Sequence, residues 1–289
     1  MKRLIILILL VALAAIAGVV VRSSSSKNGT VAEIRELVSH QATDDVREEV
    51  RQTYELAPGA RVELGNINGP VTIETSDTTT AEVYIERTAS SQEALNRRQI
   101  EIQADTSRLR IVAETTDHNF IDKLFGAKAS ERVKLKLPRQ ISLFAKGVNG
   151  AFLVEDLDGS VDIGGINGKV RVANASGTAM LKGINGSISL GMKRIEGEGV
   201  VLSGINGNID LQLPADVNAD FDAKGMHGRV IADIPNVSVD KGKNGSYWAR
   251  IGSGGSGITA KGINGNIRLS HAVPSTPATP AAAETVDKN

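Results

Sequence analysis

The chain has 289 residues, 33 lysines and arginines against 33 aspartates and glutamates, 3% aromatic residues and no cysteine. The balanced charge excludes a global positive field that would recruit nucleic acid, and the missing cysteine excludes disulfides, thiolate metal sites, cysteine nucleophiles and a lipidated N-terminal cysteine. With so few rings, the core must consist of valine, isoleucine and leucine, and it is expected to be thin.

The N-terminus carries a targeting signal. Lys2 and Arg3 precede an apolar run over residues 4–21, which ends at Arg22 and four serines. Residues 1–22 fit a cleaved signal peptide, since small-x-small alanine pairs occur within the run. They also fit a transmembrane anchor, because eighteen residues at about 1.5 Å rise span about 27 Å. The anchor is the favoured interpretation. The protein is therefore predicted to be anchored in the cell membrane and facing outside, or exported to the periplasm.

Residues 23–58 are predicted to form a spacer and a short helical stalk. Thr30 and Glu33 form a capping-box pattern at the start of one helix. A second helix is expected over 44–54, where Val46, Val50 and Tyr54 recur at every fourth position.

From residue 59 the pattern changes to strands, and a β-repeat domain is predicted over 59–270. Alternating apolar residues mark short strands, for example at Val71 and Ile73. Residues 118–130 interrupt the pattern with helical spacing; they indicate either a short helix packed on the domain or a protruding apolar contact surface. Residues 271–289 are rich in proline, alanine and threonine and are predicted to be a disordered tail.

A four-residue motif recurs along the chain. Its identical Gly-Ile-Asn-Gly copies lie at 165–168, 183–186, 204–207 and 262–265, and its close variants at 67–69, 147–150 and 225–228. Five consecutive final glycines, from Gly150 to Gly186, are nine residues apart when weaker copies such as 156–159 are included. The Gly-Ile-Asn-Gly copies and their close variants, called strong here, alternate with the weaker copies. The repeat unit therefore has eighteen residues, and later twenty-one.

Each copy predicts a turn followed by a strand. Asn-Gly tolerates the positive φ angles of a tight turn, and each strong turn precedes two apolar residues separated by a polar one, such as Ile188 and Leu190.

Two architectures fit this repeat of one turn and one strand. In a β-solenoid, or β-helix-like fold, equivalent corners stack about 4.8 Å apart and their asparagines can form an amide ladder. In an antiparallel meander, strong turns lie along one edge. The solenoid is favoured, because stacking explains why the same Ile and Asn return.

These Gly-Ile-Asn-Gly copies resemble the DUF4097 family of adhesin-like proteins and its relative, the head GIN domain family. The resemblance covers about residues 48–270. The chain departs from the family's pattern at His227, where asparagine is expected, and over 234–257. It implies a bacterial envelope protein with a repetitive β fold, and it brings no catalytic residues.

The candidate residues fall into two sets. The predicted structural turn residues are Asn68, Gly69, Asn149, Gly150, Asn167, Gly168, Asn185, Gly186, Asn206, Gly207, Asn264 and Gly265. Lysines that precede four of the turns would form a basic stripe if the corners stack: Lys146, Lys182, Lys224 and Lys261. The stripe is either a surface for anionic envelope polymers or lipid headgroups, or a row of solubilising residues that discourages aggregation.

Three other features have structural interpretations. The loop at 252–257 satisfies G-x-G-x-x-G but lacks the following helix, so it is not expected to hold a phosphate. Asp156 and Asp158 are expected to serve a turn rather than a calcium ion, and Trp248 is expected to cap the open end of the core rather than bind a sugar.

The sequence predicts a non-enzymatic envelope module without cofactor or metal, structural or interacting in role and adhesin-like. One alternative is an envelope-stress or sensory accessory protein that contacts a membrane protein through its helices. A third, an enzyme acting on polysaccharide, is disfavoured because no acidic column follows the repeat. The predicted partners are the membrane, through the N-terminal helix, and anionic envelope polymers or a membrane protein; nucleic acid is excluded, and the oligomeric state stays open.

Overall fold

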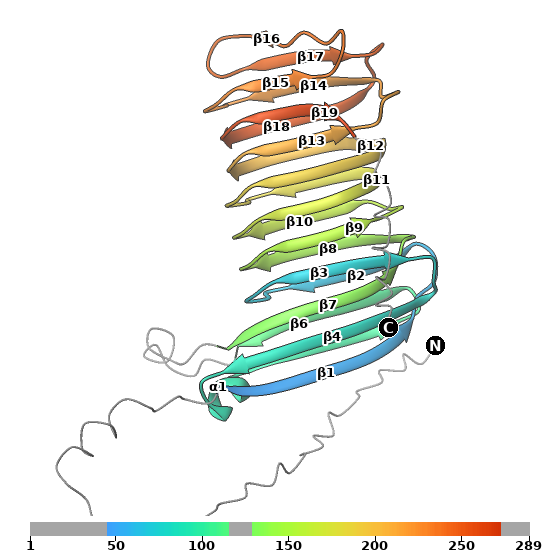
Figure 1. Cartoon of the computed structure of the whole chain (residues 1–289), viewed down its shortest axis with the longest axis vertical. Coiled ribbons are helices and arrows are strands. Elements are labelled where there is room, and N and C mark those ends of the chain that lie inside the picture. Colours follow the sequence, from blue (N-terminus) through green and yellow to red (C-terminus); the bar gives the residue numbers. More distant parts are fainter. Residues whose placement is uncertain (1–44, 116–128, 273–289) are drawn as a thin grey trace, which may run out of the picture. The chain divides into compact units, whose positions relative to one another are not determined.

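A computed structural model describes residues 45–115 and 129–272, and this part of the chain is all-β, as predicted. Its strands join in one hydrogen-bonded sheet, shown as a stack in Figure 1. The strands are β1 (Val46–Glu55), β2 (Ala60–Gly65), β3 (Val71–Ser76), β4 (Thr80–Ala89), β5 (Arg98–Asp105), β6 (Arg108–Thr115), β7 (Ser130–Pro138), β8 (Ile141–Val148), β9 (Phe152–Asp156), β10 (Val161–Ile166), β11 (Val170–Lys182), β12 (Ile188–Asn206), β13 (Ile209–Leu213), β14 (Ala219–Lys224), β15 (Val230–Asp233), β16 (Asp240–Lys241), β17 (Tyr247–Ile251), β18 (Ser256–Asn264) and β19 (Ile267–His271). A single described helix, α1 (Gln92–Arg97), lies between β4 and β5.

The repeat strands pair in parallel with the equivalent strand of the next coil. Val161 of β10 lies beside Leu143 of β8 on one side and Ala179 of β11 on the other, each eighteen residues away. Ile188 pairs with Ile209, twenty-one residues away. Every pairing among β8 to β13, β18 and β19 is parallel, so the alternative of an antiparallel meander is wrong.

Alternation along each strand produces an aliphatic core between the two walls of the stack. The inward positions of β8, β10 and β12 carry residues such as Leu143, Ile163 and Leu202, all fully buried. Each such side chain contributes about 1.5–3 kcal/mol on burial. Within residues 45–115 and 129–272, Phe152 and Phe221 are the only aromatic residues among the largest fully buried side chains. The core is therefore aliphatic, as the composition indicates.

The order of coils in the stack differs from their order in the chain. The coil of β2 and β3 lies between β6–β7 and β8–β9, although β6 follows it in sequence. The coil of β18 and β19 lies between β12–β13 and β14–β15, so the last described strands sit inside the stack (Figure 1). Each of these two coils is thus inserted between two coils that follow one another in the sequence.

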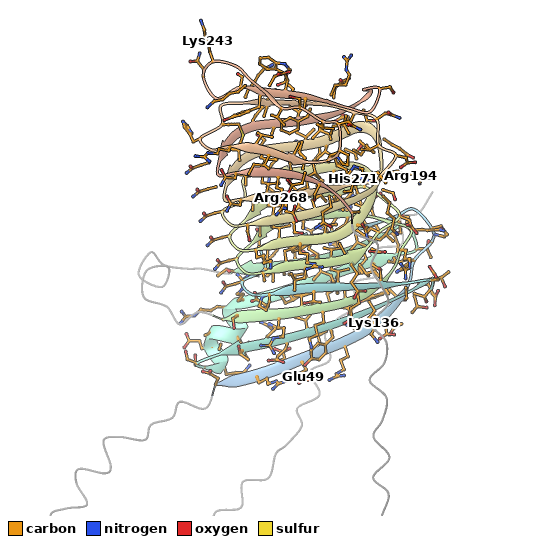
Figure 2. The ribbon with its side chains drawn as sticks, turned by 45° about the horizontal axis from the view of Figure 1, so that its top comes forward. Glu49, Lys136, Arg194, Lys243, Arg268 and His271 are labelled. Atoms are coloured by element: carbon orange, nitrogen blue, oxygen red, sulfur yellow. The ribbon has the colours of Figure 1, made fainter. Side chains whose placement is uncertain are left out.

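Antiparallel strands form the two ends of the stack. β1 pairs with β4 and β4 with β7 near Glu49, whereas β14 pairs with β17 and β17 with β16 near Lys243 (Figure 2). These two residues mark opposite ends of the stack and are used below to name them.

The prediction of a helix over 44–54 is wrong, because this segment forms strand β1. A spacing of four residues is also two periods of a strand, so Val46, Val50 and Tyr54 share one face in either structure. Pairing with β4 over ten residues decides between them. The β domain therefore begins at Val46 rather than at residue 59.

Helix α1 was not predicted from the sequence. Ser91 caps it by accepting a hydrogen bond from the Ala94 amide at 3.2 Å, and Ala94 and Leu95 are buried. Arg87 donates to the Leu95 carbonyl at 2.6 Å and pairs with Glu48 at 2.7 Å, which fixes the helix against β1 and β4.

Several predictions lie outside the described residues: the segment 1–22, the capped helix at Thr30, most of the interruption at 118–130, and the tail from residue 273. Among the residues that are described, no helix has the length and hydropathy needed to cross a membrane.

Candidate binding surface

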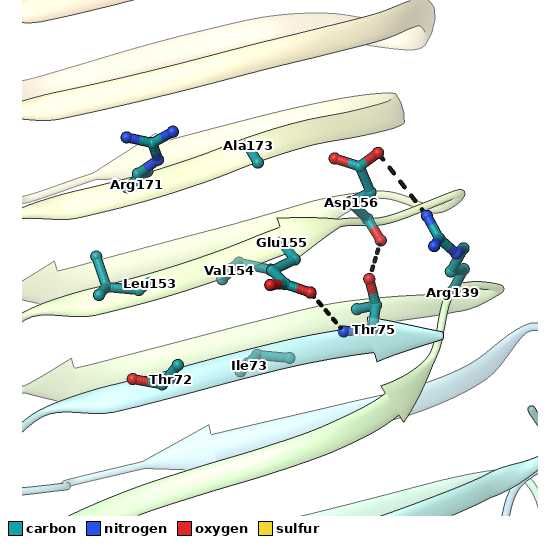
Figure 3. Close-up of a pocket in the computed structure, with 10 residues that line it drawn as sticks. All are labelled: Thr72, Ile73, Thr75, Arg139, Leu153, Val154, Glu155, Asp156, Arg171 and Ala173. Atoms are coloured by element: carbon teal, nitrogen blue, oxygen red, sulfur yellow. Dashed lines mark hydrogen bonds and ion pairs between the residues drawn. The ribbon is translucent and has the colours of Figure 1, made fainter. Parts of the chain in front are cut away.

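A shallow depression of about 510 Å³ opens on the outer wall between β3, β9 and β11 (Figure 3). It arises because β3 pairs with β9 only as far as Ile73 and Val154, while β3 continues along β7 to Ser76. The Thr75 hydroxyl donates to the Asp156 carbonyl at 2.6 Å, and the Thr75 amide donates to Glu155 at 3.2 Å. The depression is thus the seam where an early coil joins a later one, and its polar groups bond to one another.

The Asn-Gly corners form the most regular surface of the described chain. All six predicted turn asparagines lie in one column, and from Asn149 onward each side-chain amide donates to the side-chain oxygen of the preceding asparagine in the stack. The N···O distances are 2.9 Å for Asn149 to Asn68, 3.0 Å for Asn167 to Asn149, 3.1 Å for Asn185 to Asn167, 3.2 Å for Asn206 to Asn185 and 3.1 Å for Asn264 to Asn206. The side-chain amides therefore form a ladder with one polarity.

Glycine is required at this corner for two different reasons. The first glycine of each copy has a left-handed conformation, for example φ 62° at Gly183. The asparagine does not adopt positive φ, which corrects the expectation for Asn-Gly. The last glycine packs on the corner beneath it: a Cβ on Gly186 would overlap the Gly168 carbonyl oxygen and lie 2.6 Å from its carbon. Backbone stacking therefore excludes any side chain there.

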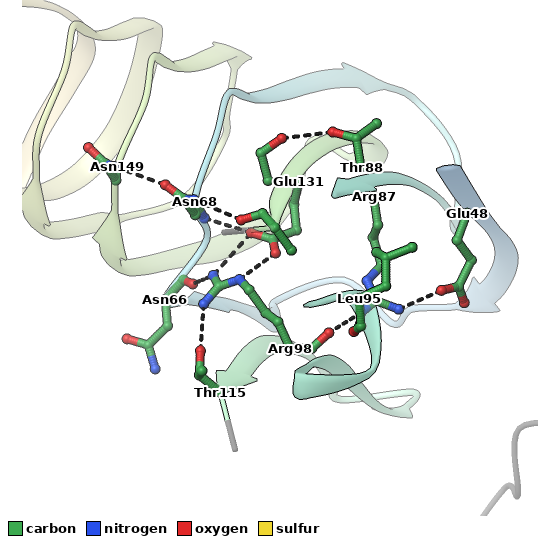
Figure 4. A network of polar contacts seen from close by, with 12 residues as sticks. Glu48, Asn66, Asn68, Arg87, Thr88, Leu95, Arg98, Thr115, Glu131 and Asn149 are labelled. Atoms are coloured by element: carbon green, nitrogen blue, oxygen red, sulfur yellow. Dashed lines mark hydrogen bonds and ion pairs between the residues drawn. The ribbon is translucent and has the colours of Figure 1, made fainter. Parts of the chain in front are cut away.

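A buried carboxylate lies beside the first asparagine of the ladder, Asn68 (Figure 4). Glu131 is 1% exposed, and its Oε2 accepts hydrogen bonds from the backbone N–H of Asn68 at 2.7 Å and from the Arg98 guanidinium at 3.0 Å. Arg98 also donates to the Asn66 carbonyl, while the Asn68 side chain donates to the Ala129 carbonyl at 2.9 Å. The sequence analysis predicted Asn68 as a turn residue but missed its partners Arg98 and Glu131, because they lie in different strands and belong to no motif.

The ladder ends at Asn264 on the other side. His227 occupies the next corner, and its backbone amide still donates to the Ile263 carbonyl at 2.8 Å. Its side chain is exposed, and an imidazole has no amide group that could continue the ladder. The backbone stacking thus extends one corner further than the amide ladder.

The four predicted lysines share one column beside these corners. Lys146 lies next to Gly164, Gly164 next to Lys182, Lys182 next to Ser203, Ser203 next to Lys261, and Lys261 next to Lys224. All four lysines are exposed. Lys224 approaches Asp222 at 3.4 Å, whereas Lys146, Lys182 and Lys261 make no ion pair with the described residues. The structure therefore brings the lysines together in a row that is interrupted twice.

The glycine-rich loop at 252–257 is occupied by the chain's own polar groups. Asn218 Oδ1 accepts the Ser253 amide at 2.8 Å, and Asp220 accepts the Gly255 amide at 3.1 Å. The Gly255 hydrogen bond, followed by Arg250, lowers the pKa of Asp220. The loop amides thus hold a carboxylate of β14.

The two aspartates considered for calcium face cationic side chains. The Lys193 ammonium lies 3.4 Å from Asp156 and 3.1 Å from Asp158, and Asn174 donates to Asp156 at 2.8 Å. Asp156 and Asp158 lie at the corner opposite the asparagine ladder, and their ion pairs and hydrogen bond stabilise the turn there.

Tyr247, rather than Trp248, covers the core at the Lys243 end. Tyr247 is 6% exposed and donates to the Gly228 carbonyl at 2.9 Å, whereas Trp248 is 49% exposed. Adjacent strand residues point to opposite faces, so only one of the two can cover the core. The prediction for Trp248 was wrong.

No protein-family model matches the chain, and no curated protein matches it. The chain is similar to solved structures, including a protein from Clostridium sporogenes that is provisionally named a cell adhesion protein. That similarity has 14% identity and a TM-score of 0.41, and covers 78% of this chain and 100% of the other. A provisionally named adhesin from Bacteroides fragilis has 13% identity, a TM-score of 0.28, and coverage of 77% and 97%. A provisionally named lipid-binding protein from Parabacteroides distasonis has 13% identity, a TM-score of 0.27, and coverage of 77% and 94%. The resemblance to the DUF4097 family stays a prediction.

Proposed function

We propose that residues 46–271 form a β-solenoid interaction module on the outer side of a bacterial envelope, adhesin-like in role and without catalytic activity. In this proposal, the module binds linear anionic polymers along the lysine column. The observation that carries the proposal is the alignment of Lys146, Lys182, Lys261 and Lys224 in one register position of the sheet.

The spacing of the column suits a repeating ligand. Neighbouring strands are about 4.8 Å apart, so the five steps from Lys146 to Lys224 span about 24 Å. A polymer with regularly placed anionic groups can meet several lysines at once, whereas a small substrate meets one. Each exposed pair contributes only about 0.2–1 kcal/mol, so affinity must be cumulative and fall as salt rises.

The corner beside the lysines supports binding by holding them in place. Lys182 directly precedes Gly183, and the corner that follows is fixed by the amide ladder and by glycine stacking on the coil beneath. The backbone positions of the column are therefore set before a ligand arrives, which reduces the ordering cost of binding. Display outside the cell rests on the predicted signal at residues 1–22.

The first test measures binding of the full-length chain in detergent to alginate, a linear polyuronate, at low salt. Replacing Lys146, Lys182, Lys224 and Lys261 with glutamine should weaken binding at least tenfold. The matched control replaces four exposed lysines outside the column with glutamine: Lys134, Lys136, Lys241 and Lys243. The control has the same net charge and should bind within about twofold of the unmodified chain.

Equal loss in both variants would assign binding to net charge, and unchanged binding in the column variant would overturn the proposal. Phosphatidylglycerol vesicles form a second arm. Column-dependent binding to vesicles but not to alginate would assign the lysines to lipid headgroups and reject a polymer ligand.

A further inference from the structure

The two ends of the stack differ in how they finish the sheet. At the Lys243 end, β17 covers β14 and the two-residue β16 covers β17. At the Glu49 end, β1 is ten residues long and pairs with β4 alone among the described strands. Alternate residues of β1 therefore direct their N–H and C=O groups away from the sheet, which is the template for another strand.

The core-facing row of β1 leaves apolar surface uncovered. Val46, Val50 and Tyr54 are half-buried, and Val50 and Tyr54 pack against the main core, as do Ile100 and Ile102 of β5. Burial raises the pKa of the Tyr54 hydroxyl. A strand added at this edge would extend the core by one further layer.

The outward row of β1 alternates in charge. Glu49 lies between Arg47, at 2.8 Å, and Arg51, at 3.1 Å (Glu49 is labelled in Figure 2). Hydrogen bonding from Arg51 is the largest cause of the lowered pKa of Glu49. Edges that are protected against pairing commonly carry lysine or proline. This edge instead carries both signs in a self-complementary order.

That order selects one register for an antiparallel copy of the same strand. With Val50 opposite Val50, Glu49 faces Arg51 twice and Val46 faces Tyr54 twice. Centring the pair on Glu49 would oppose Arg47 to Arg51 and Glu49 to itself, and centring it on Arg51 would oppose two arginines. Opposite charges across a strand pair stabilise it, and like charges destabilise it.

We propose that the free edge of β1 pairs antiparallel with β1 of a second copy of this chain, centred on Val50, in a two-fold symmetric dimer. A two-fold axis makes the same patch serve both copies, as this charge pattern requires. The proposal does not depend on polymer binding at the lysine column.

The absence of cysteine from the chain permits a direct test by disulfide trapping. In the full-length chain, Val50→Cys places two thiols opposite each other, with Cα atoms about 4.5–5.5 Å apart, within disulfide range. Mild oxidation in membranes should yield a covalent dimer on non-reducing electrophoresis. The matched control is Thr53→Cys, which is exposed on the same strand. Its two thiols would be six residues apart, about 20 Å, and should cross-link at least tenfold less.

Charge reversal gives an independent readout. In the Val50→Cys background, Glu49→Arg or Arg51→Glu alone should reduce cross-linking at least fivefold, and the double exchange should restore it. Sedimentation of the unmodified chain in detergent should give a dimer, and Glu49→Arg should shift it to a monomer. Equal cross-linking at positions 50 and 53 overturns the proposal. So does a monomeric Val50→Cys variant whose thiol stays reduced because another segment covers β1.

Discussion

Each coil has two corners, and they differ in what they tolerate. At the asparagine corner, every copy repeats the same backbone path, with Asn185 bridging to Asn167 on one side and to Asn206 on the other. At the opposite corner, strand register changes between coils: Gly177 pairs with Ile195, eighteen residues on, but Ala179 pairs with Val200, twenty-one residues on. The three extra residues of the longer repeat therefore lie entirely at the opposite corner.

This difference shows which contacts determine register. The asparagine corner stacks backbone on backbone, so it has no space for another atom, and its amides must lie at one height to hydrogen-bond. The opposite corner bulges outward, where extra residues meet solvent. One corner sets the alignment of the coils, and the other accommodates variation in their length.

The largest expected effect comes from lengthening the two corners. Inserting Gly-Ser between Asn185 and Gly186 should cost about 4 kcal/mol or more, because it breaks the ladder and shifts the following strand. The same insertion between Glu196 and Gly197 should cost about 1 kcal/mol or less, as expected for a longer surface loop. Chemical denaturation of both variants measures the difference. Similar losses would show that the two corners are equally constrained.

A single added methyl group should separate stacking from chain length. Gly186→Ala should lower the free energy of unfolding by about 3 kcal/mol, because its Cβ overlaps the Gly168 carbonyl at positive φ. The matched control is Gly164→Ala, whose Cβ would lie 3.4 Å from the Lys182 carbonyl oxygen. That substitution should change stability by less than about 0.5 kcal/mol. A tolerated Gly186→Ala would contradict the account of the motif's last glycine.

The smallest effect concerns the amides alone. Asn185→Ala removes one donor and one acceptor of the ladder and should cost about 1–2 kcal/mol. Asn174→Ala, at the opposite corner, removes one hydrogen bond to Asp156 and should cost about half as much. Thermal unfolding compares the two. An equal or larger loss at Asn174 would show that the ladder adds nothing beyond ordinary hydrogen bonds.

Local patterns in the sequence were sufficient for much of this structure. Two-residue alternation identified strands such as the one carrying Val71 and Ile73, and the scarcity of rings indicated an aliphatic core. The recurrence of the same corner also predicted parallel stacking, the amide ladder and the shared column of lysines. Spacing along the chain carries this information because each coil repeats the geometry of the one before it.

Where a pattern fitted two structures, only tertiary contacts chose between them. Val46, Val50 and Tyr54 fit a helix and a strand equally well, and pairing with β4 made the segment a strand. Tyr247 and Trp248 were equally placed to close the core, and the register with β14 turned Tyr247 inward. The pairing of Arg98 with Glu131 had no signal in sequence at all.

The order of the coils was also beyond the sequence. Neighbouring coils present the same row of backbone groups and aliphatic side chains on both faces, so the coil of β2 and β3 can stack beside many others. Its place between β7 and β9, like that of β18 between β12 and β14, depends on long-range pairing. The repeat unit could be predicted from the amino-acid sequence, because its corner is formed by residues that are neighbours in the chain. The order in which the coils stack could not be predicted, because many coil faces are nearly equivalent and several orders would bury similar surfaces.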